Sequence, residues 1–173
     1  MREIIKKYGI DGIWHFTDGA NLSSIVQHGG LLSYAELRRR GIVIPAAGGN
    51  DWSHEADAWA GVDEYVHLAF IPNHPMLYRA KMDGRITNPY WLKIDLSILD
   101  VEGVRVTREV ANKSGARLLT QEEATEQIDW EVLFTRTDWN DAAVKARRQA
   151  AEKSQILIPN TIPLKRILGK MNG

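Results

Sequence analysis

The sequence has no cysteine, and this absence removes several kinds of chemistry at once. Without cysteine there is no disulfide framework, no zinc–thiolate site and no thiol nucleophile. An excess of positive charge is also missing, because 22 lysines and arginines balance 22 aspartates and glutamates. A neutral chain has no global field for nucleic acid. Any nucleic-acid contact must therefore come from a local patch, and tracking of duplex phosphates is excluded as the main activity.

Long hydrophobic runs are missing as well. The N-terminal heptapeptide Met-Arg-Glu-Ile-Ile-Lys-Lys has too short an apolar run for a signal peptide, and no stretch approaches the length of a membrane span. We therefore expect a cytoplasmic protein with no membrane partner. The chain has 173 residues, of which 44% are hydrophobic, so it can bury a core. This length predicts one domain over residues 1–173.

The short motifs of several enzyme classes do not occur. There is no Gly-x-x-x-x-Gly-Lys loop, no Gly-x-Gly-x-x-Gly turn and no Gly-x-Ser-x-Gly elbow, which argues against the common nucleotide folds and a serine hydrolase. All five histidines lie in the first 74 residues, and Asp51 and Asp57 lie near them. A hydrolytic metal site built from these groups is conceivable, but their spacing matches no metal motif. We therefore expect no bound metal.

Strands and short helices alternate without a βαβ rhythm, which indicates an α+β fold. Alternating or continuous apolar runs predict strands over 13–17, 31–33, 65–70, 91–96, 104–107, 155–159 and 162–168. Helical spacing and N-cap residues predict helices over 22–26, 34–40 and 141–153, with a helical turn at 121–126, and residues 1–11 fit either a short amphipathic helix or a lead-in to the first strand. Residues 76–78 are expected in a short turn, and 128–134 fit either a helix or a strand.

Residues 12–33 form the segment in which we expect a ligand. The predicted strand carries His15 and Thr17 to the start of a short helix, which ends at Gly29 and Gly30. Free backbone N–H groups and the helix dipole at such a place favour an anion, typically a phosphate. In the alternative interpretation, His15 is a core residue and the glycines only end the helix.

Residues 41–61 are predicted to form a long polar and aromatic loop. Loops of this length are uncommon inside a compact domain and are often lids or substrate loops. The run Arg38-Arg39-Arg40, just before it, is the most concentrated positive charge in the chain. With Trp52 and Trp59 it is close enough in sequence to line a groove for an unstacked base.

Four segments, in order, carry a resemblance to a known family. They are His15-Phe16-Thr17 with Asn21-Leu22 and residues 28–32, the 65–70 strand leading to His74-Pro75-Met76, the Thr107 to Asn112 segment, and the closing strands from Gln155. On these segments the chain resembles the DarT-type DNA ADP-ribosyltransferases. These toxins move ADP-ribose from NAD onto a base of single-stranded DNA. The resemblance covers nearly the whole chain and implies a compact split-sheet fold with NAD lying across the two central strands.

The resemblance also implies roles for individual residues. His15 is expected to hold an NAD ribose and Phe70 to lie near the nicotinamide, and the remaining expected NAD contacts are Thr17, Asn21, Gly30 and Leu31. Expected contacts to DNA are Arg38, Arg39, Arg40, Trp52, His67, Met76 and Arg147. The expected catalytic positions are Gln155 and His54, where His54 stands at a position at which the family uses an arginine.

Gln155 departs from the family, which has a glutamate immediately before its Val/Ile-Leu-Val/Ile-Pro run. Breaking the bond between nicotinamide and ribose builds positive charge on the sugar, and a carboxylate stabilises that charge. Glutamine still hydrogen-bonds a ribose hydroxyl, but it has no charge and accepts no proton from the attacking base. We therefore expect the transferase to be inactivated or weakened in this chain.

Three explanations of Gln155 are open. The first, which we favour, is an engineered exchange that spares an expression host from a toxic enzyme, and the second is a natural, weakened homologue. The third is that Glu152 takes over, which requires its side chain to reach the same pocket.

The leading hypothesis is a bacterial toxin that ADP-ribosylates a base of single-stranded DNA, with guanine favoured over thymine. Its expected partner is an antitoxin ADP-ribosyl hydrolase, such as a macrodomain. The sugar cation is expected to form between residue 155 and His15, so we expect these two strands to be adjacent. The alternatives are a non-catalytic NAD or nucleic-acid binding module and a His-based metal nuclease.

Overall fold

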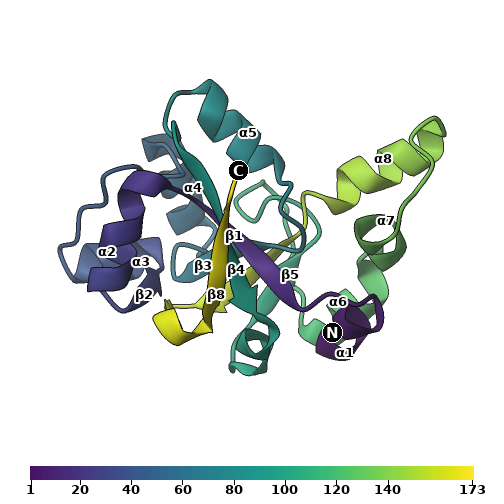
Figure 1. Ribbon diagram of the computed structural model, residues 1–173, viewed down its shortest axis with the longest axis horizontal. Helices are drawn as coiled ribbons and strands as arrows, with labels where there is room; N and C mark the ends of the chain where they lie inside the picture. Colours follow the sequence, from purple (N-terminus) through teal and green to yellow (C-terminus); the bar gives the residue numbers. More distant parts are fainter.

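The computed structural model describes residues 1–50 and 52–173 with their side chains, and residue 51 only as part of a helix. Its centre is a six-stranded sheet in the order β5-β6-β3-β1-β4-β8 (Figure 1). The bounds of these strands are β1 Gly12–Asp18, β3 Tyr65–Ala69, β4 Pro89–Asp95, β5 Arg105–Thr107, β6 Gln155–Pro159 and β8 Ile167–Asn172. Neighbouring strands run antiparallel, and a separate antiparallel pair joins β2 Gly30–Leu32 to β7 Thr161–Pro163.

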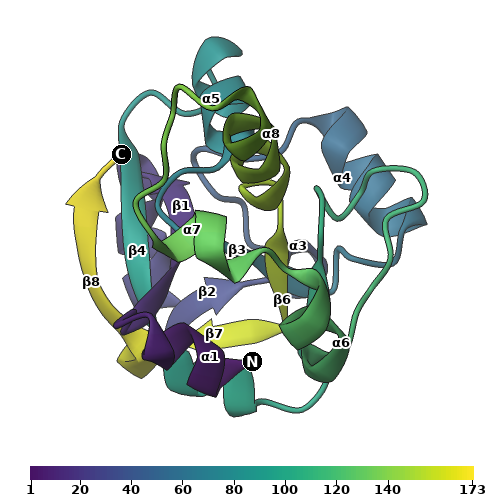
Figure 2. The same ribbon diagram turned by 90° about the vertical axis from the view of Figure 1, so that its right-hand side faces the viewer.

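Short helices surround the sheet. One group, α1 Arg2–Lys7, α6 Gln121–Gln127 and α7 Trp130–Phe134, packs on the side opposite α2 Leu22–Gln27, α3 Tyr34–Arg39 and α4 Asp51–Trp59 (Figures 1 and 2). The remaining helices are α5 Pro75–Met82 and α8 Ala142–Ala151, with 3-10 turns at Gly19–Asn21, Leu96–Asp100 and Leu164–Arg166. The largest core cluster joins the first group to the inner strands through Ile5, Ile13, Leu68, Val132 and Ile156. This mixture of an antiparallel sheet with helices is the expected α+β fold.

The helix starts predicted from polar capping residues are correct. Ser33 accepts a hydrogen bond from the Glu36 N–H at 3.2 Å and caps α3. Asp141 caps α8 by accepting from the N–H groups of Ala143 and Val144. A short polar side chain satisfies N–H groups that have no partner inside the helix, so it marks the start in the sequence itself.

Two predicted irregular segments are wrong, because each contains a helix. The expected loop 41–61 holds α4, which begins after Asn50, whose side chain accepts from the Ser53 N–H at 2.8 Å. The expected turn at 76–78 lies inside α5, which His74 caps and which has Pro75 in its first turn. Both caps were visible in the sequence, but neither segment has a strongly apolar face to indicate a helix. Residues 128–134, left open between helix and strand, contain α7.

The closing segment 162–168 is not one strand. It divides into the end of β7, a 3-10 turn and the start of β8, since the chain passes from the small β2–β7 pair to the edge of the large sheet. A continuous apolar run does not reveal such a change of partner.

The central strands β1 and β3 separate along their length. β1 pairs with β4 over seven residue pairs, from Gly12 with Asp95 to Asp18 with Pro89. Against β3 it has one pair, Trp14 with Ala69. Beyond that pair the two strands diverge, and the sheet is open between them.

The expected adjacency of the strands of His15 and Gln155 is wrong. β3 lies between β1 and β6, and Ala69 is the residue that faces Trp14 on one side and Gln155 on the other. Strand order depends on pairing between distant segments, which the pattern of a single strand does not encode.

The Gly30 backbone lies against β7 too closely for any side chain. A Cβ on Gly30 would lie 2.0 Å from the Ile162 carbonyl oxygen, and its φ of +144° is a conformation that other residues rarely adopt. We expect Gly30→Ala to lower the free energy of unfolding by about 3 kcal/mol, because backbone has to move. Denaturant unfolding measures this change. Gly169→Ala is the control, since a Cβ there meets nothing within 4 Å, and equal effects of the two substitutions would contradict the prediction.

Candidate active site

A cavity lies at the opening between β1 and β3. One wall carries His15, Phe16 and Thr17 from β1, and the opposite wall carries Tyr65, Val66 and His67 from β3. Most of the other lining residues come from α2, the 28–37 segment, the 44–49 segment, α4 and the start of β6, and the rest are Asn21, Asp63, Met76, Ile86, Val110 and Asn112. Gln155 is one of them, so it lines the same cavity as His15 although their strands are not neighbours.

His15 is held in one orientation by the strand across the opening. Its Nδ1 lies 3.0 Å from the His67 carbonyl oxygen, where the two strands no longer pair. Burial lowers the pKa of His15 to about 4, so the imidazole is neutral at physiological pH. Because a carbonyl only accepts, Nδ1 carries the proton and Nε2 is an acceptor. The ring therefore offers a hydrogen-bond acceptor to a ligand hydroxyl.

Thr17 and Asn21 form a buried, hydrogen-bonded pair that holds the 44–49 segment at the cavity. The Asn21 amide nitrogen donates to Thr17 Oγ1 at 3.1 Å and to the Ala46 carbonyl at 2.6 Å. The Asn21 amide oxygen accepts from the Ala46 N–H at 3.0 Å. Asn21 thus fastens the 44–49 segment over the cavity, a structural role beside the expected contact with NAD.

The structure does not place Phe70 with the other expected NAD contacts. Gly30, Leu31 and Met76 line the cavity, but Phe70 is 2% exposed and packs edge-on against Trp130 and Phe134 in the core. Its position just beyond β3 turns its side chain to the face covered by α7. The expectation that Phe70 lies near the nicotinamide is therefore wrong. The physical reason is that a buried aromatic ring loses more apolar surface to the closed core than it would at an open cavity, and this burial stabilises the fold.

His54 and His67 both lie at the cavity. His54 stacks on Tyr34 with ring centroids 3.8 Å apart, which ties α4 to α3 across one end of the lining. His67 places its Nε2 3.0 Å from the Val62 carbonyl oxygen, which fixes its ring.

Gln155 begins β6 and is 5% exposed. Its Oε1 accepts a hydrogen bond from the Ala111 N–H at 2.8 Å. The proposed substitute Glu152 does not line the cavity, because its carboxylate is paired with Arg148 at 2.9 Å. The structure therefore does not support the explanation that Glu152 takes over the role of the missing glutamate.

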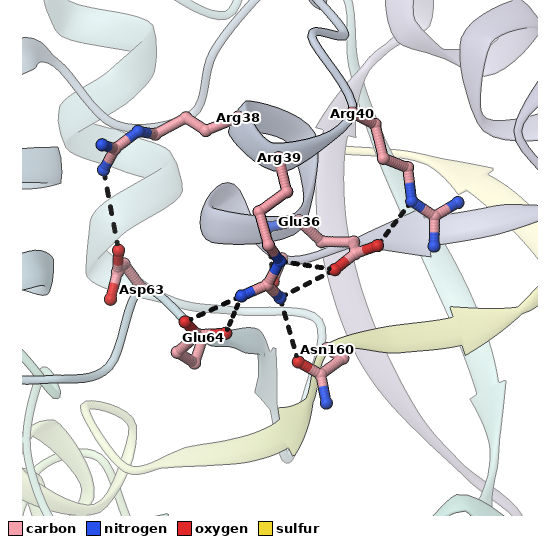
Figure 3. Close-up of polar contacts among 8 residues, drawn as sticks. Glu36, Arg38, Arg39, Arg40, Asp63, Glu64 and Asn160 are labelled. Atoms are coloured by element: carbon pink, nitrogen blue, oxygen red, sulfur yellow. Dashed lines mark hydrogen bonds and ion pairs between the residues drawn. The ribbon is translucent and has the colours of Figure 1, made fainter.

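The arginines expected to bind DNA are engaged by carboxylates (Figure 3). Arg39 lies between Glu36 and Glu64, with nitrogen–oxygen distances of 2.7 and 3.0 Å, and Arg40 also pairs with Glu36. Arg38 points to Asp63 at 4.0 Å. Within residues 1–50 and 52–173, the cavity lining contains no arginine or lysine. The pairs with Glu36 are three and four residues apart on α3 and can be read from the sequence, whereas Asp63 and Glu64 approach α3 only in the fold.

Of the other expected DNA contacts, His67 and Met76 line the cavity, whereas Arg147 and Trp52 lie outside it. Arg147 on α8 donates to Asp129 and Glu131 at 2.8 to 2.9 Å, and these carboxylates raise its pKa. Trp52 and Trp59 on α4 are 72% and 91% exposed and border a groove with residues 109–116. Seven residues apart on a helix, the two rings share one face. Val110 and Asn112 line both this groove and the cavity.

Asp57 and Asn112 are among the polar lining residues that sequence reasoning does not assign to the site. Asn112 donates to Ser53 Oγ at 3.2 Å, which connects the 109–116 segment to α4. Asp57 received attention only as a metal ligand, because its helix was taken for a loop. In the part of the chain described with side chains, no three histidine or acidic residues come close enough to hold a metal ion. The nuclease alternative therefore has no ligand set there.

The family is decided by a comparison with models of known protein families. Residues 14–169 match the model described as "ssDNA thymidine ADP-ribosyltransferase, DarT". The chain belongs to the DarT family. A comparison with curated proteins finds no match.

Solved structures of DarT proteins share the fold. Thermus sp. 2.9 DarT in complex with ADP-ribosylated ssDNA superposes with a TM-score of 0.68 at 21% identity, covering 91% of this chain and 78% of that one. The complex of the same protein with NAD+ gives 0.63 at 22% identity, covering 91% and 79%. Thermosipho africanus DarTG with ADP-ribose gives 0.64 at 17% identity, and the match covers 93% of this chain and 43% of that one. The split sheet described above is therefore the DarT fold. No helix among the described residues is long and apolar enough to cross a membrane.

Proposed function

We propose that this chain transfers ADP-ribose from NAD to a base of single-stranded DNA, as the toxin of a toxin–antitoxin pair in the bacterial cytoplasm. The observation that carries the proposal is the cavity in the open sheet, which brings His15, Thr17, His54, His67 and Gln155 together. Membership of the DarT family supports the reaction class. The partner expected on this basis is an antitoxin ADP-ribosyl hydrolase, and the DarTG relative supports such a pairing.

NAD is the proposed co-substrate, and its binding site is the cavity. His15 Nε2 would accept a hydrogen bond from a ribose hydroxyl, because its Nδ1 proton is committed to the His67 carbonyl. Gly30 and Leu31 would border the ribose, and Asn21 would act by holding the 44–49 segment in place. A Thermus relative has been solved with NAD+, which supports the choice of co-substrate.

The reaction needs a group that faces positive charge on the ribose as nicotinamide leaves. Gln155 offers only the amide dipole, so the proposed activity of this chain is weaker than that of a chain with glutamate there. Its amide oxygen holds the Ala111 N–H, and the amide NH₂ occupies the place of the second carboxylate oxygen.

The acceptor base is proposed to be thymine. The description of the family names thymidine, which favours thymine over the guanine expected from the 65–68 sequence. Exposed Trp52 and Trp59, on a groove that shares residues with the cavity, support a single strand as substrate, since unstacked bases bind aromatic platforms. Met76 and His67 line the cavity and would contact the flipped base.

The test is incubation of the protein and of Gln155→Glu with NAD and short single-stranded oligonucleotides, each holding one kind of target base. Mass spectrometry is expected to show a gain of one ADP-ribose on the thymine oligonucleotide, and none after annealing to a complement. Modification of the guanine oligonucleotide alone would reverse the proposed base. Tight NAD binding by both proteins without transfer to any oligonucleotide would contradict the proposed enzyme and favour a binding module.

A further inference from the structure

We propose that Asp57 is a catalytic carboxylate of this site, which takes the proton of the attacking base and faces the positive charge on the sugar in the absence of a glutamate at position 155. The inference rests on the proposed transferase function. It concerns a residue on α4, a helix that sequence reasoning did not predict.

Asp57 and Gln155 line the same cavity, and residues 111–112 link the elements that carry them. The Ala111 N–H donates to Gln155 Oε1 at 2.8 Å. The side chain of the next residue, Asn112, donates to Ser53 Oγ at 3.2 Å, and Ser53 lies one turn before Asp57 on α4. Two consecutive residues of one segment thus contact Gln155 and the helix of Asp57.

His67 extends this cluster from the sheet. His67 lies opposite Leu157, and Ala69 lies opposite Gln155, so the side chains of His67 and Gln155 leave the same face as diagonal neighbours. Diagonal positions in an antiparallel pair are about 7–8 Å apart. His67 Nε2 lies 3.0 Å from the Val62 carbonyl oxygen, and the Val62 N–H donates to the Asp57 carbonyl oxygen at 2.8 Å, so the ring lies beside the end of α4 that carries Asp57. A sugar carbon between Gln155 and His67 would therefore lie near Asp57.

Asp57 is the cavity carboxylate that lacks a compensating cation. The other one, Asp63, points to Arg38 at 4.0 Å. Among the described residues, no arginine or lysine forms an ion pair with Asp57. Burial raises the pKa of the Asp57 carboxyl, while His67, His54 and Asn112 act to lower it. A base of raised pKa accepts a proton more readily than an exposed aspartate does.

In the proposed step, the bond between ribose C1′ and the nicotinamide nitrogen breaks, and its electron pair leaves with nicotinamide, which becomes neutral. A nitrogen of the base gives its electron pair to C1′ and forms the new bond. The proton on that nitrogen passes to Asp57, which later releases it to solvent. No oxidant, reductant or metal enters the step.

The experiment compares the native chain, Asp57→Asn and Glu126→Gln with NAD and a single-stranded oligonucleotide. Asparagine keeps the size and hydrogen-bonding shape of the side chain, and Glu126 is an exposed acid on α6 that lines neither the cavity nor the groove of Trp52 and Trp59. Asp57→Asn is expected to lower kcat at least about 100-fold, as for loss of a general base. The Kd for NAD, measured by calorimetry, should stay within about threefold, because the change acts on the transition state. Thermal unfolding verifies that each variant is folded.

The outcomes separate this inference from the proposed function. Full activity of Asp57→Asn would overturn the role of Asp57 and leave the transferase intact. An inactive native chain together with an active Gln155→Glu would also overturn the role of Asp57 and leave the transferase function intact. In that case Asp57 could not support the reaction without a glutamate at position 155. Inactivity of both would overturn the proposed function itself. A loss in Asp57→Asn that is matched by Glu126→Gln would also count against the inference.

Discussion

Gln155→Glu is expected to raise the rate of ADP-ribose transfer by about 100-fold or more, the scale of a single charged group placed at a developing charge. The Gln155 side chain is 5% exposed, and its Oε1 already holds the Ala111 N–H at 2.8 Å. Glutamate has the same length, so one carboxylate oxygen keeps this bond. The other oxygen takes the place of the amide NH₂ and brings a negative charge into the cavity.

The gain should fall on kcat rather than on NAD affinity. The charge acts on the oxocarbenium-like sugar, which exists only at the transition state. Steady-state kinetics with a thymine oligonucleotide, together with a Kd for NAD, separates these two effects. Gln149→Glu serves as the control, because Gln149 is an exposed residue of α8 outside the cavity. A rise in NAD affinity without a rise in kcat would contradict the expected role.

Asp18→Ala is expected to cost about 3 kcal/mol of unfolding free energy, because hydrogen bonds to a buried charge are strong and their donors would be left without a partner. The Asp18 carboxylate is 3% exposed. It accepts from the N–H groups of Ala20, Thr87 and Asn88 at 2.8 to 2.9 Å. It thereby joins the end of β1 to the segment before β4, beside the cavity wall that Thr17 forms.

The same contacts give a pH dependence of defined sign. Backbone N–H donors, those of Ala20 and Asn88 first, lower the pKa of Asp18 below its ordinary value of 3.8. A group with a lowered folded-state pKa contributes stability above its unfolded pKa and loses it as the pH falls through the folded value. The native chain should therefore lose stability below about pH 4, and Asp18→Asn should lose less over that range.

Urea unfolding between pH 3 and pH 7 measures both effects of Asp18. Asp11→Ala is the matched control, since Asp11 pairs with Lys93 at 2.6 Å but its side chain is 78% exposed. An exposed ion pair contributes about 0–1 kcal/mol, so this control should change little. Equal losses in Asp11→Ala and Asp18→Ala would show that the buried hydrogen bonds do not matter.

The candidate site illustrates how far sequence reasoning reaches. His15 and Thr17 are predicted as ligand contacts from a local pattern, a short apolar strand beside a helix that ends in glycines, and the structure places both at the cavity. Asp57 is not predicted to contact NAD or DNA, because α4 has polar and small residues on most sides and the sequence indicates a loop there. Phe70 was assigned to the ligand although its face of β3 is turned to α7. The predictions for Asp57 and Phe70 fail because they depend on which face of α4 and of β3 is covered by other elements. Those elements are distant in the sequence.

The amino-acid sequence by itself determined the local structure and the family. Apolar spacing and capping residues place most strands and several helices, since these depend on neighbours within a few residues. The ordered segments from His15 to Gln155 are the ones through which the chain resembles DarT proteins. The tertiary structure alone decided that β1 and β3 separate, that β3 lies between His15 and Gln155, and that Asp63 and Glu64 reach Arg38 and Arg39. Strand order and ion pairing are settled by competition between groups far apart in the chain, and only the folded molecule brings those competitors together.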